Sequence, residues 1–185
     1  ADRGRVEAAA ERAHALLSPA ALPVGELEMA DYVVKLLGQS HLQLVTAESC
    51  TGGLIAGRLT DLPGVSEVFK GGVVVYSNEL KHRLLGVPEE LLAEHGAVSR
   101  ECAEAMIRGA VSCLEADCAI AVTGIAGPGG GTEAKPVGLV YIGAKLGEAE
   151  QVREFRFNGD RRAIRERTIE HAFAMLRELL EPSTF

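Results

Sequence analysis

Tryptophan is absent from this sequence of 185 residues, and aromatic residues make up only 4% of it. No apolar run reaches the roughly 18 residues that a membrane-spanning helix needs, and the first residues lack the apolar core of a signal peptide. The four cysteines show neither C-x-x-C spacing nor a histidine partner pattern: Cys50, Cys102, Cys113 and Cys118. These absences favour a reduced, cytoplasmic setting without structural zinc.

Clusters of basic residues are also missing. The formal net charge is −7, and the lysines and arginines are scattered along the chain. Proteins that bind nucleic acids usually carry a basic patch or stripe, so we expect no direct nucleic-acid contact and no membrane partner. Small anionic ligands remain compatible with this charge, because one arginine or a few backbone N–H groups can hold a phosphate.

The order of apolar segments predicts one folded domain. Residues 1–25 are expected to be an appendage or linker that is helical in part, and residues 26–185 form the domain. Helical and strand patterns alternate from Glu26 onward, which predicts a three-layer α/β/α fold with a mostly buried sheet. Ser99 is expected to cap the amphipathic helix that follows it. The strands "VGLVYIGAKL" and "QVREFRF" are separated only by "GEAE", so they should pair antiparallel and make the sheet mixed.

The first candidate for chemistry is "TAESCTGG", residues 46–53. Ser49 follows a predicted strand and precedes a predicted helix, where free backbone N–H groups favour an oxyanion hole. Gly52 and Gly53 would let a substrate approach the main chain. Cys50 is a rival nucleophile, although no histidine signature accompanies it. The alternative interpretation is a helix cap followed by an ordinary turn.

The second candidate is "VVVYSNELK", residues 73–81. Tyr76 is expected to end a strand, Asn78 to cap a helix, and Lys81 to lie in its first turn. The helix dipole and partial burial would lower the pKa of Lys81, and a neutral amine can deprotonate a serine without histidine. Tyr76 would then relay the proton or orient the lysine. The alternative is a surface lysine after a core tyrosine.

Two further segments contain residues suited to ligand binding. Thr123, Gly124 and Gly127 belong to "VTGIAGPGGGTEAKPVG", a glycine-rich loop that fits neither a P-loop nor a Rossmann fingerprint. Its N–H groups could form an anion nest, or it is a plain surface loop. Arg161 opens the last helix after "NGD", and the arginines there are either ligands or a solvated charged face.

Five motifs taken together resemble the CinA C-terminal domain family. They are "TAESCTGG", "VVVYSNELKHRLLGV", "HGAVSRECAEAM", "AVTGIAGPGGGTEAKPVGLVYIG" and "FRFNGDRRAIRERT", in the family's order between about Glu26 and Glu181. Active members of that family are nicotinamide-nucleotide amidases, which convert nicotinamide mononucleotide and water into nicotinate mononucleotide and ammonia. The resemblance implies Ser49 as nucleophile, Lys81 as catalytic lysine and Tyr76 as their companion, with no metal and no cofactor.

The resemblance also suggests a substrate-binding set and an assembly. The set consists of residues beside the motif serine, lysine and glycines: Glu48, Cys50, Thr51, Gly52, Gly53, Asn78, Thr123, Gly124, Gly127 and Arg161. A homodimer or higher homo-oligomer is expected. Longer members carry an additional N-terminal domain with nucleotide pyrophosphatase activity, which is not expected of these 185 residues.

Other functions remain open at this point. The first is a non-catalytic nucleotide-binding module with the same fold, although such a module has no need for Ser49, Tyr76 and Lys81 together. The second is an interaction protein in competence or damage response, as the family's historical name suggests. A Cys50-based thiol hydrolase is a smaller rival.

Overall fold

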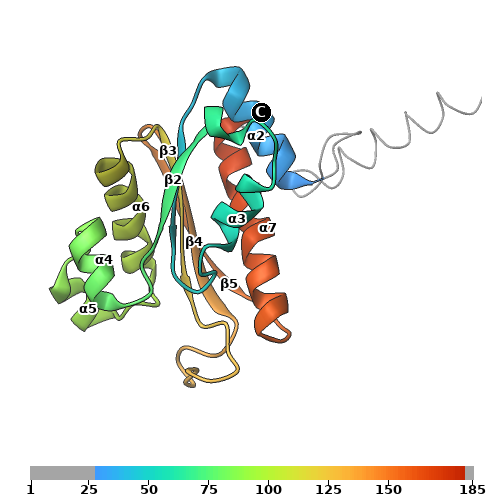
Figure 1. The fold of residues 1–185 in the computed structure, drawn as a ribbon. Coiled ribbons are helices and arrows are strands. Elements are labelled where there is room, and N and C mark those ends of the chain that lie inside the picture. Colours follow the sequence, from blue (N-terminus) through green and yellow to red (C-terminus); the bar gives the residue numbers. More distant parts are fainter. Residues whose placement is uncertain (1–27, 182–185) are drawn as a thin grey trace, which may run out of the picture.

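A five-stranded mixed sheet lies between two layers of helices (Figure 1). This computed structural model describes residues 28–181, so the predicted appendage over residues 1–25 lies outside the described residues. In chain order the elements are α2 (Met29–Ser40), β1 (Leu44–Glu48), α3 (Leu54–Thr60), the 3₁₀ turn η1 (Val65–Glu67), β2 (Phe69–Val74), α4 (Asn78–Leu85), α5 (Glu89–His95), α6 (Arg100–Leu114), β3 (Cys118–Gly124), β4 (Leu139–Leu146), β5 (Ala149–Arg156) and α7 (Arg161–Leu180). The predicted three-layer α/β fold is confirmed.

The sheet has the strand order β2-β1-β3-β4-β5. β1 runs parallel to both β2 and β3, whereas β3, β4 and β5 pair antiparallel. The predicted antiparallel pairing of β4 with β5 is therefore correct. Every residue of β1 is buried, as is usual for a strand with helices on both faces.

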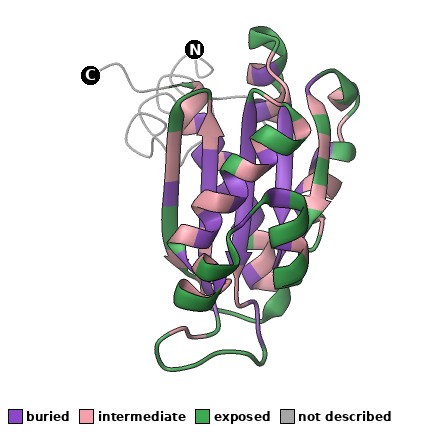
Figure 2. Ribbon diagram, turned by 90° about the vertical axis from the view of Figure 1, so that its left-hand side faces the viewer, coloured by how far each residue is buried: buried purple, intermediate pink, exposed green. Residues whose placement is uncertain are grey.

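Each face of the sheet has its own hydrophobic core. α2, α3 and α7 cover one face, with Leu37, Ile55 and Phe173 among the buried residues. α4, α5 and α6 cover the other, where Met106 and Ile107 are buried. Figure 2 shows the burial concentrated on the central strands and the inward sides of the helices. Burying one such large side chain contributes about 1.5–3 kcal/mol to folding.

Some local predictions need correction. Asn78 is the first residue of α4, and its cap is Ser77, whose hydroxyl accepts a hydrogen bond from the Leu80 N–H. Tyr76 does not end β2 as expected, because the strand already ends at Val74. α5 had no prediction, because its seven residues are too few for a clear helical period.

No helix within residues 28–181 has the length and apolarity to cross a membrane.

The carboxyl ends of the parallel strands lie together at one edge of the sheet. β1, β2 and β3 all end at the lower side of Figure 1, beside the first turn of α7. Open α/β sheets bind ligands at the carboxyl ends of their parallel strands. Ser49, Lys81 and Gly124 come from segments at these ends.

Candidate active site

The segment Ser49–Gly53 forms a tight turn between β1 and α3. The Ser49 N–H continues the sheet by donating to the Val122 carbonyl at 3.1 Å, and the Gly52 N–H donates to the Ser49 carbonyl at 3.1 Å. Gly52 and Gly53 have φ of +62° and +93°, values that residues with a Cβ rarely adopt. The glycine pair therefore allows a sharp turn directly after the candidate nucleophile.

Glu48 anchors the start of α3. Its carboxylate is 1% exposed and accepts from the N–H groups of Gly53 at 2.9 Å, Ile55 at 3.1 Å and Ala56 at 2.8 Å. It thus satisfies donors that a helix N-terminus leaves free, although it precedes the helix by several residues. Glu48, which was predicted to bind substrate, therefore bonds to the main chain of the turn and to the first residues of α3.

Those bonds narrow the choice of oxyanion donors. All N–H groups beside the motif serine were candidates from the sequence, but those of Gly52 and Gly53 are engaged within the turn. Within residues 28–181, the N–H groups of Cys50 and Thr51 donate no hydrogen bond to another residue. These two groups lie next to Ser49 and are the donors available for a developing negative charge.

The Lys81 side chain contacts Ser49 and is almost completely buried, with 1% of its surface exposed. Its Nζ is 3.2 Å from Ser49 Oγ, 2.8 Å from the Val75 carbonyl oxygen and 3.3 Å from the Tyr76 carbonyl oxygen. No carboxylate lies within ion-pair distance in the described part of the chain. Burial therefore lowers the pKa of Lys81 below its ordinary value of 10.5, and the nearby thiols Cys102 and Cys50 oppose this only in part.

All three contacts of Lys81 are with oxygen atoms, and Nζ can donate to each of them. When the amine is neutral, two N–H groups can still donate to the carbonyls of Val75 and Tyr76, and the lone pair can then turn to the Ser49 hydroxyl. In that state Lys81 can take the serine proton. Because Lys81 is almost completely buried, the alternative of an exposed surface lysine is excluded.

Cys50 is poorly suited to act as the nucleophile. Its side chain is 5% exposed, and burial raises the pKa of its thiol to about 11. The thiol, which is a weaker nucleophile than the thiolate, is therefore the form present at neutral pH. No hydrogen bond joins it to a histidine in residues 28–181. Cys50 serves as a packing residue of the turn.

Tyr76, Arg161 and Gly127 meet at the rim of the site. Arg161 donates from Nη1 to the Gly127 carbonyl at 2.8 Å and from Nη2 to the Tyr76 hydroxyl at 3.4 Å. Tyr76 is 61% exposed, and only its main-chain carbonyl contacts Lys81. Within the described chain, no hydrogen bond connects the Tyr76 hydroxyl to Ser49 or Lys81. The structure therefore contains no hydrogen-bonded path for the predicted proton relay through Tyr76.

Three other predicted residues have mainly structural contacts. Thr123 is buried and donates from its hydroxyl to the Ala97 carbonyl at 2.6 Å. A Cβ at Gly124 would lie 2.8 Å from the Leu139 carbonyl oxygen, so glycine permits the close approach of β4. The exposed Asn78 lines a surface pocket with Glu89 and Leu92 of α5.

Two residues near the site were not among the predicted ligands. Arg165 donates from Nη2 to the Thr51 carbonyl at 2.6 Å. Lys135, in the glycine-rich loop, donates to the carbonyls of His95 at 2.6 Å and Val98 at 2.7 Å, which fixes this loop against the start of α6. The position of Arg165 one turn after Arg161 could have indicated it, because residues four apart share a helix face.

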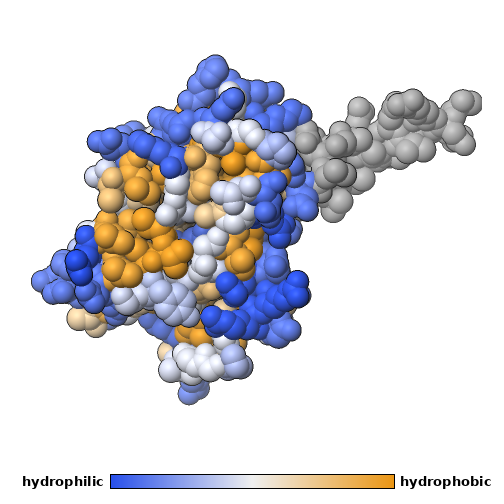
Figure 3. Space-filling view, viewed as in Figure 1, coloured by the Kyte–Doolittle hydropathy of each residue, from blue (hydrophilic) through white to orange (hydrophobic). Residues whose placement is uncertain are grey.

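Surface properties change around the site. Figure 3 shows hydrophobic residues gathered over β2 and the neighbouring parts of α3 and α4, where Leu54, Val74 and Leu84 are exposed. Val74 packs close to Gly53, since a Cβ built on that glycine would be 3.4 Å from Val74 Cγ2. The rim thus combines an apolar surface with the guanidinium of Arg161.

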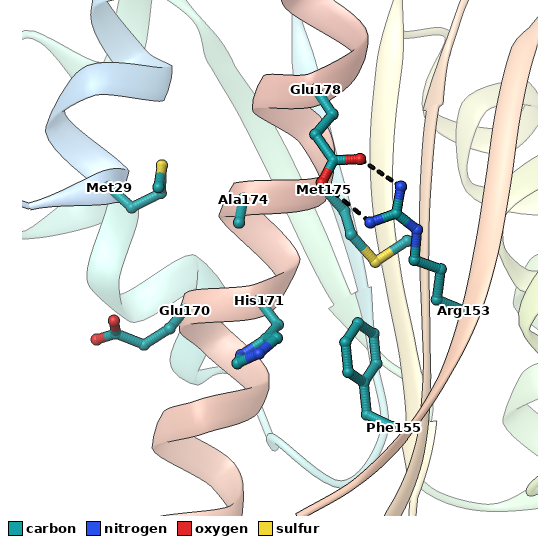
Figure 4. Close-up of a pocket in the computed structure, with 8 residues that line it drawn as sticks. All are labelled: Met29, Arg153, Phe155, Glu170, His171, Ala174, Met175 and Glu178. Carbon is teal, nitrogen blue, oxygen red and sulfur yellow. Dashed lines mark hydrogen bonds and ion pairs between the residues drawn. The ribbon is translucent and has the colours of Figure 1, made fainter. Parts of the chain in front are cut away.

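A separate pocket lies along α7, beside β5 (Figure 4). It has a volume of about 240 Å³, and its lining residues are Met29, Arg153, Phe155, Glu170, His171, Ala174, Met175 and Glu178. Arg153 and Glu178 form an ion pair across it. None of the predicted site residues lines this pocket. Residues 28–181 also contain no cluster of three or more His, Cys, Asp or Glu that could hold a metal ion.

Fold and site together define an α/β protein with a serine and a buried lysine paired at the carboxyl ends of its parallel strands. The family model of the CinA C-terminal domain matches residues 26–180, so the chain belongs to this family.

Curated relatives are considerably longer than this chain. It is 55% identical over 148 residues to a "competence-damage inducible protein" of Caldicellulosiruptor bescii, which covers 80% of this chain and 36% of the relative. It is 50% identical over 162 residues to a "CinA-like protein" of Chloroherpeton thalassium, covering 85% and 39%. The chain therefore spans less than half the length of these relatives.

Solved structures match over nearly their whole length. The competence/damage inducible protein CihA from Agrobacterium tumefaciens has 44% identity and a TM-score of 0.80, covering 82% of this chain and 93% of that one. The competence damage-inducible protein A from Klebsiella pneumoniae subsp. pneumoniae has 35% identity and a TM-score of 0.81, covering 84% and 97%.

Proposed function

We propose that this chain is an amidohydrolase that converts nicotinamide mononucleotide and water into nicotinate mononucleotide and ammonia. The observation that carries the catalytic part is the 3.2 Å contact between the buried Lys81 Nζ and Ser49 Oγ. The substrate is inferred from the resemblance of the five motifs to the amidase members of the family.

The first half of the reaction forms an acyl-enzyme. Ser49 Oγ attacks the carboxamide carbon while its proton passes to the neutral Lys81 amine, 3.2 Å away. The carbonyl oxygen becomes an oxyanion that accepts hydrogen bonds from the free N–H groups of Cys50 and Thr51. When this tetrahedral intermediate collapses, the C–N bond breaks, and Lys81 returns the proton to the leaving nitrogen. Ammonia departs, and the nicotinoyl group remains on Ser49 as an ester.

Water completes the reaction by the same route. Lys81, neutral again, takes a proton from a water molecule that attacks the ester carbon. Collapse of the second tetrahedral intermediate breaks the bond to Ser49 Oγ, which recovers its proton from Lys81. The overall reaction consumes one water and releases one ammonia, so it needs neither an oxidant nor a cofactor.

The rim would hold the nucleotide part of the substrate. Arg161 already bridges the Gly127 carbonyl and the Tyr76 hydroxyl, and a guanidinium suits a phosphate because it can donate two parallel hydrogen bonds. The glycine-rich loop contributes backbone N–H groups, and Val74 offers an apolar surface to the pyridine ring. A cytoplasmic location and a homodimer or larger homo-oligomer belong to the same proposal.

Ammonia release from nicotinamide mononucleotide tests the proposal directly. The native protein and Cys50→Ala should be active, whereas Ser49→Ala and Lys81→Ala should lose activity by about 10³-fold or more. A native protein that binds the nucleotide but releases no ammonia would be a nucleotide-binding module instead. Loss of activity in Cys50→Ala with activity retained in Ser49→Ala would transfer the nucleophile to the thiol.

A further inference from the structure

Arg165 reaches the nucleophile turn from the opposite side to Lys81. It lies on α7, one turn after Arg161, and is partly buried. Its Nη2 donates to the Thr51 carbonyl oxygen at 2.6 Å. The same nitrogen would be 3.4 Å from a Cβ built at Gly52, so the guanidinium lies directly against the turn.

This contact fixes one peptide group at both ends. In the peptide that joins Thr51 to Gly52, the carbonyl accepts from Arg165 at 2.6 Å and, at the longer distance of 3.4 Å, from the Leu54 N–H. The N–H of the same peptide donates to the Ser49 carbonyl at 3.1 Å. The two preceding peptide groups carry the free N–H groups of Cys50 and Thr51. Because they lie between Ser49 and the anchored peptide, their orientation depends on that anchor.

The guanidinium also contributes an uncompensated positive charge. Within the described chain, Arg165 makes no ion pair, unlike Arg58, which pairs with Glu28 and Glu166. Its Nε is buried without a hydrogen-bond partner. The charge reaches the turn, since Arg165 favours the thiolate of Cys50 and so opposes the rise in the pKa of that thiol. It would favour an oxyanion at the same place.

We propose that Arg165 is a positioning residue for the acyl transfer, which holds the Cys50 and Thr51 N–H groups toward the developing oxyanion and adds positive charge behind them. The inference rests on the proposed function, because it assigns a second residue to the same reaction. It separates two arginines on one helix face: Arg161 faces the substrate, and Arg165 acts through the main chain of the turn.

The test compares Arg165→Met and Arg165→Lys with Arg167→Met. Arg167 is a matched control on the same helix, since it is exposed and its hydrogen bond goes to the Asn158 carbonyl, away from the turn. For ammonia release, Arg165→Met should lower kcat by about 100-fold, the usual cost of losing an oxyanion-hole donor, and leave KM within about twofold. Arg165→Lys keeps a charge but not the fork geometry, so it should fall between Arg165→Met and the native protein. Arg167→Met should behave as the native protein.

Two readouts distinguish positioning from a general packing role. The first readout uses a third variant, Arg165→Ala, whose small side chain leaves space beside the turn. Guanidinium chloride at millimolar concentration should raise its turnover by about tenfold, because the guanidinium ion can occupy that space. A fluorophosphonate probe measures the reactivity of Ser49 without the nucleotide, and it should label Arg165→Met about 10- to 100-fold more slowly than the native protein. Melting temperatures of all variants show whether the fold is intact.

The outcomes separate this inference from the proposed function. In one outcome, the native protein releases no ammonia, but the probe labels its Ser49 faster than it labels Ser49 in the Arg165 variants. The substrate proposal then fails, and the role of Arg165 stands. Equal labelling of native protein and Arg165→Met overturns the inference, whatever the ammonia assay gives. A raised KM with unchanged kcat in Arg165→Met also overturns it, because Arg165 would then bind substrate. A native protein that neither releases ammonia nor is labelled by the probe overturns both.

Discussion

The candidate site has a buried half and an exposed half, and the two differ in how their residues are held. Ser49, Lys81 and Glu48 are each less than a tenth exposed, and Glu48 and Lys81 bond to main-chain groups on several sides. Tyr76 and Arg161 lie at the surface and bond to each other and to Gly127. The buried half suits proton transfer, because low solvent access lowers the pKa of the lysine. The exposed half suits recognition of a ligand that arrives from solvent.

The difference arises because the hydrogen bonds of the inner half are shielded from water, whereas those of the rim are open to it. A buried donor or acceptor that loses its partner costs about 1–3 kcal/mol, so the inner arrangement cannot relax easily. A rim contact can exchange with water at little cost, and a ligand can replace it. We therefore expect substitutions in the buried half to lower kcat and substitutions at the rim to raise KM.

The largest expected effect comes from Lys81. Lys81→Met removes the base but keeps an apolar stem of similar length, and kcat should fall by about 10⁴-fold. Lys81→Arg should be equally inactive at every pH, because a guanidinium does not lose its proton in proteins. Steady-state ammonia release measures both variants. Activity of Lys81→Arg close to that of the native protein would show that the positive charge of the side chain, and not its basicity, matters.

The next effect concerns pH. Lys81 acts as a base only when neutral, and burial lowers its pKa below 10.5. The value of kcat/KM should therefore rise by about tenfold per pH unit below this lowered pKa and level off above it. A pH profile of the native protein gives the midpoint. A midpoint no lower than that of an ordinary lysine, or a profile that falls where it should rise, would contradict the assignment of the base.

Arg161 should give a smaller effect of another kind. Arg161→Met removes the guanidinium that reaches Gly127 and Tyr76, so KM should rise by about tenfold, with kcat changed by less than about threefold. Arg162→Met is the matched control, since Arg162 is exposed and makes no hydrogen bond in the described part of the chain. A fall in kcat with unchanged KM would move Arg161 into the catalytic half.

The smallest effect is expected for Tyr76→Phe. The substitution removes a hydroxyl whose partner is 3.4 Å away and keeps the carbonyl that contacts Lys81. We expect kcat and KM to stay within about threefold of the native values. Substrate kinetics of this variant beside the native protein provide the measurement. A fall in turnover by about two orders of magnitude or more would restore the proton relay through Tyr76.

Much of the fold was predictable from local patterns. Ser99 was correctly assigned as the cap of α6, and its hydroxyl accepts from the Cys102 N–H. The short link between β4 and β5 implied their antiparallel pairing, which the register confirms. Shorter elements were harder. The seven residues of α5 are too few for a clear helical period, and Ser77 and Asn78 are neighbours of residue types that both cap helices.

The site was predictable in its residue types but not in its contacts. Ser49 and Lys81 were candidates because each follows a strand, yet nothing in their separation of 32 residues sets a distance between them. Glu48 was grouped with the ligands since it precedes Ser49, whereas its carboxylate caps α3. Arg165 is one of the arginines after "NGD", for which the sequence left a ligand role and a solvated face open, and only the packing of α7 brings it to Thr51.

The sequence by itself determined the α/β layers, the glycine turn after Ser49 and the amphipathic helices, because these depend on hydrophobic period, caps and backbone freedom over a few residues. The tertiary structure alone decided that Lys81 is buried beside Ser49, with no carboxylate of residues 28–181 within ion-pair distance, and that Tyr76 faces solvent. Burial and the distance between remote side chains arise from how the sheet and its helices pack, and no local pattern encodes them. The lowered pKa of Lys81, on which the proposed chemistry depends, is therefore a property of the folded molecule.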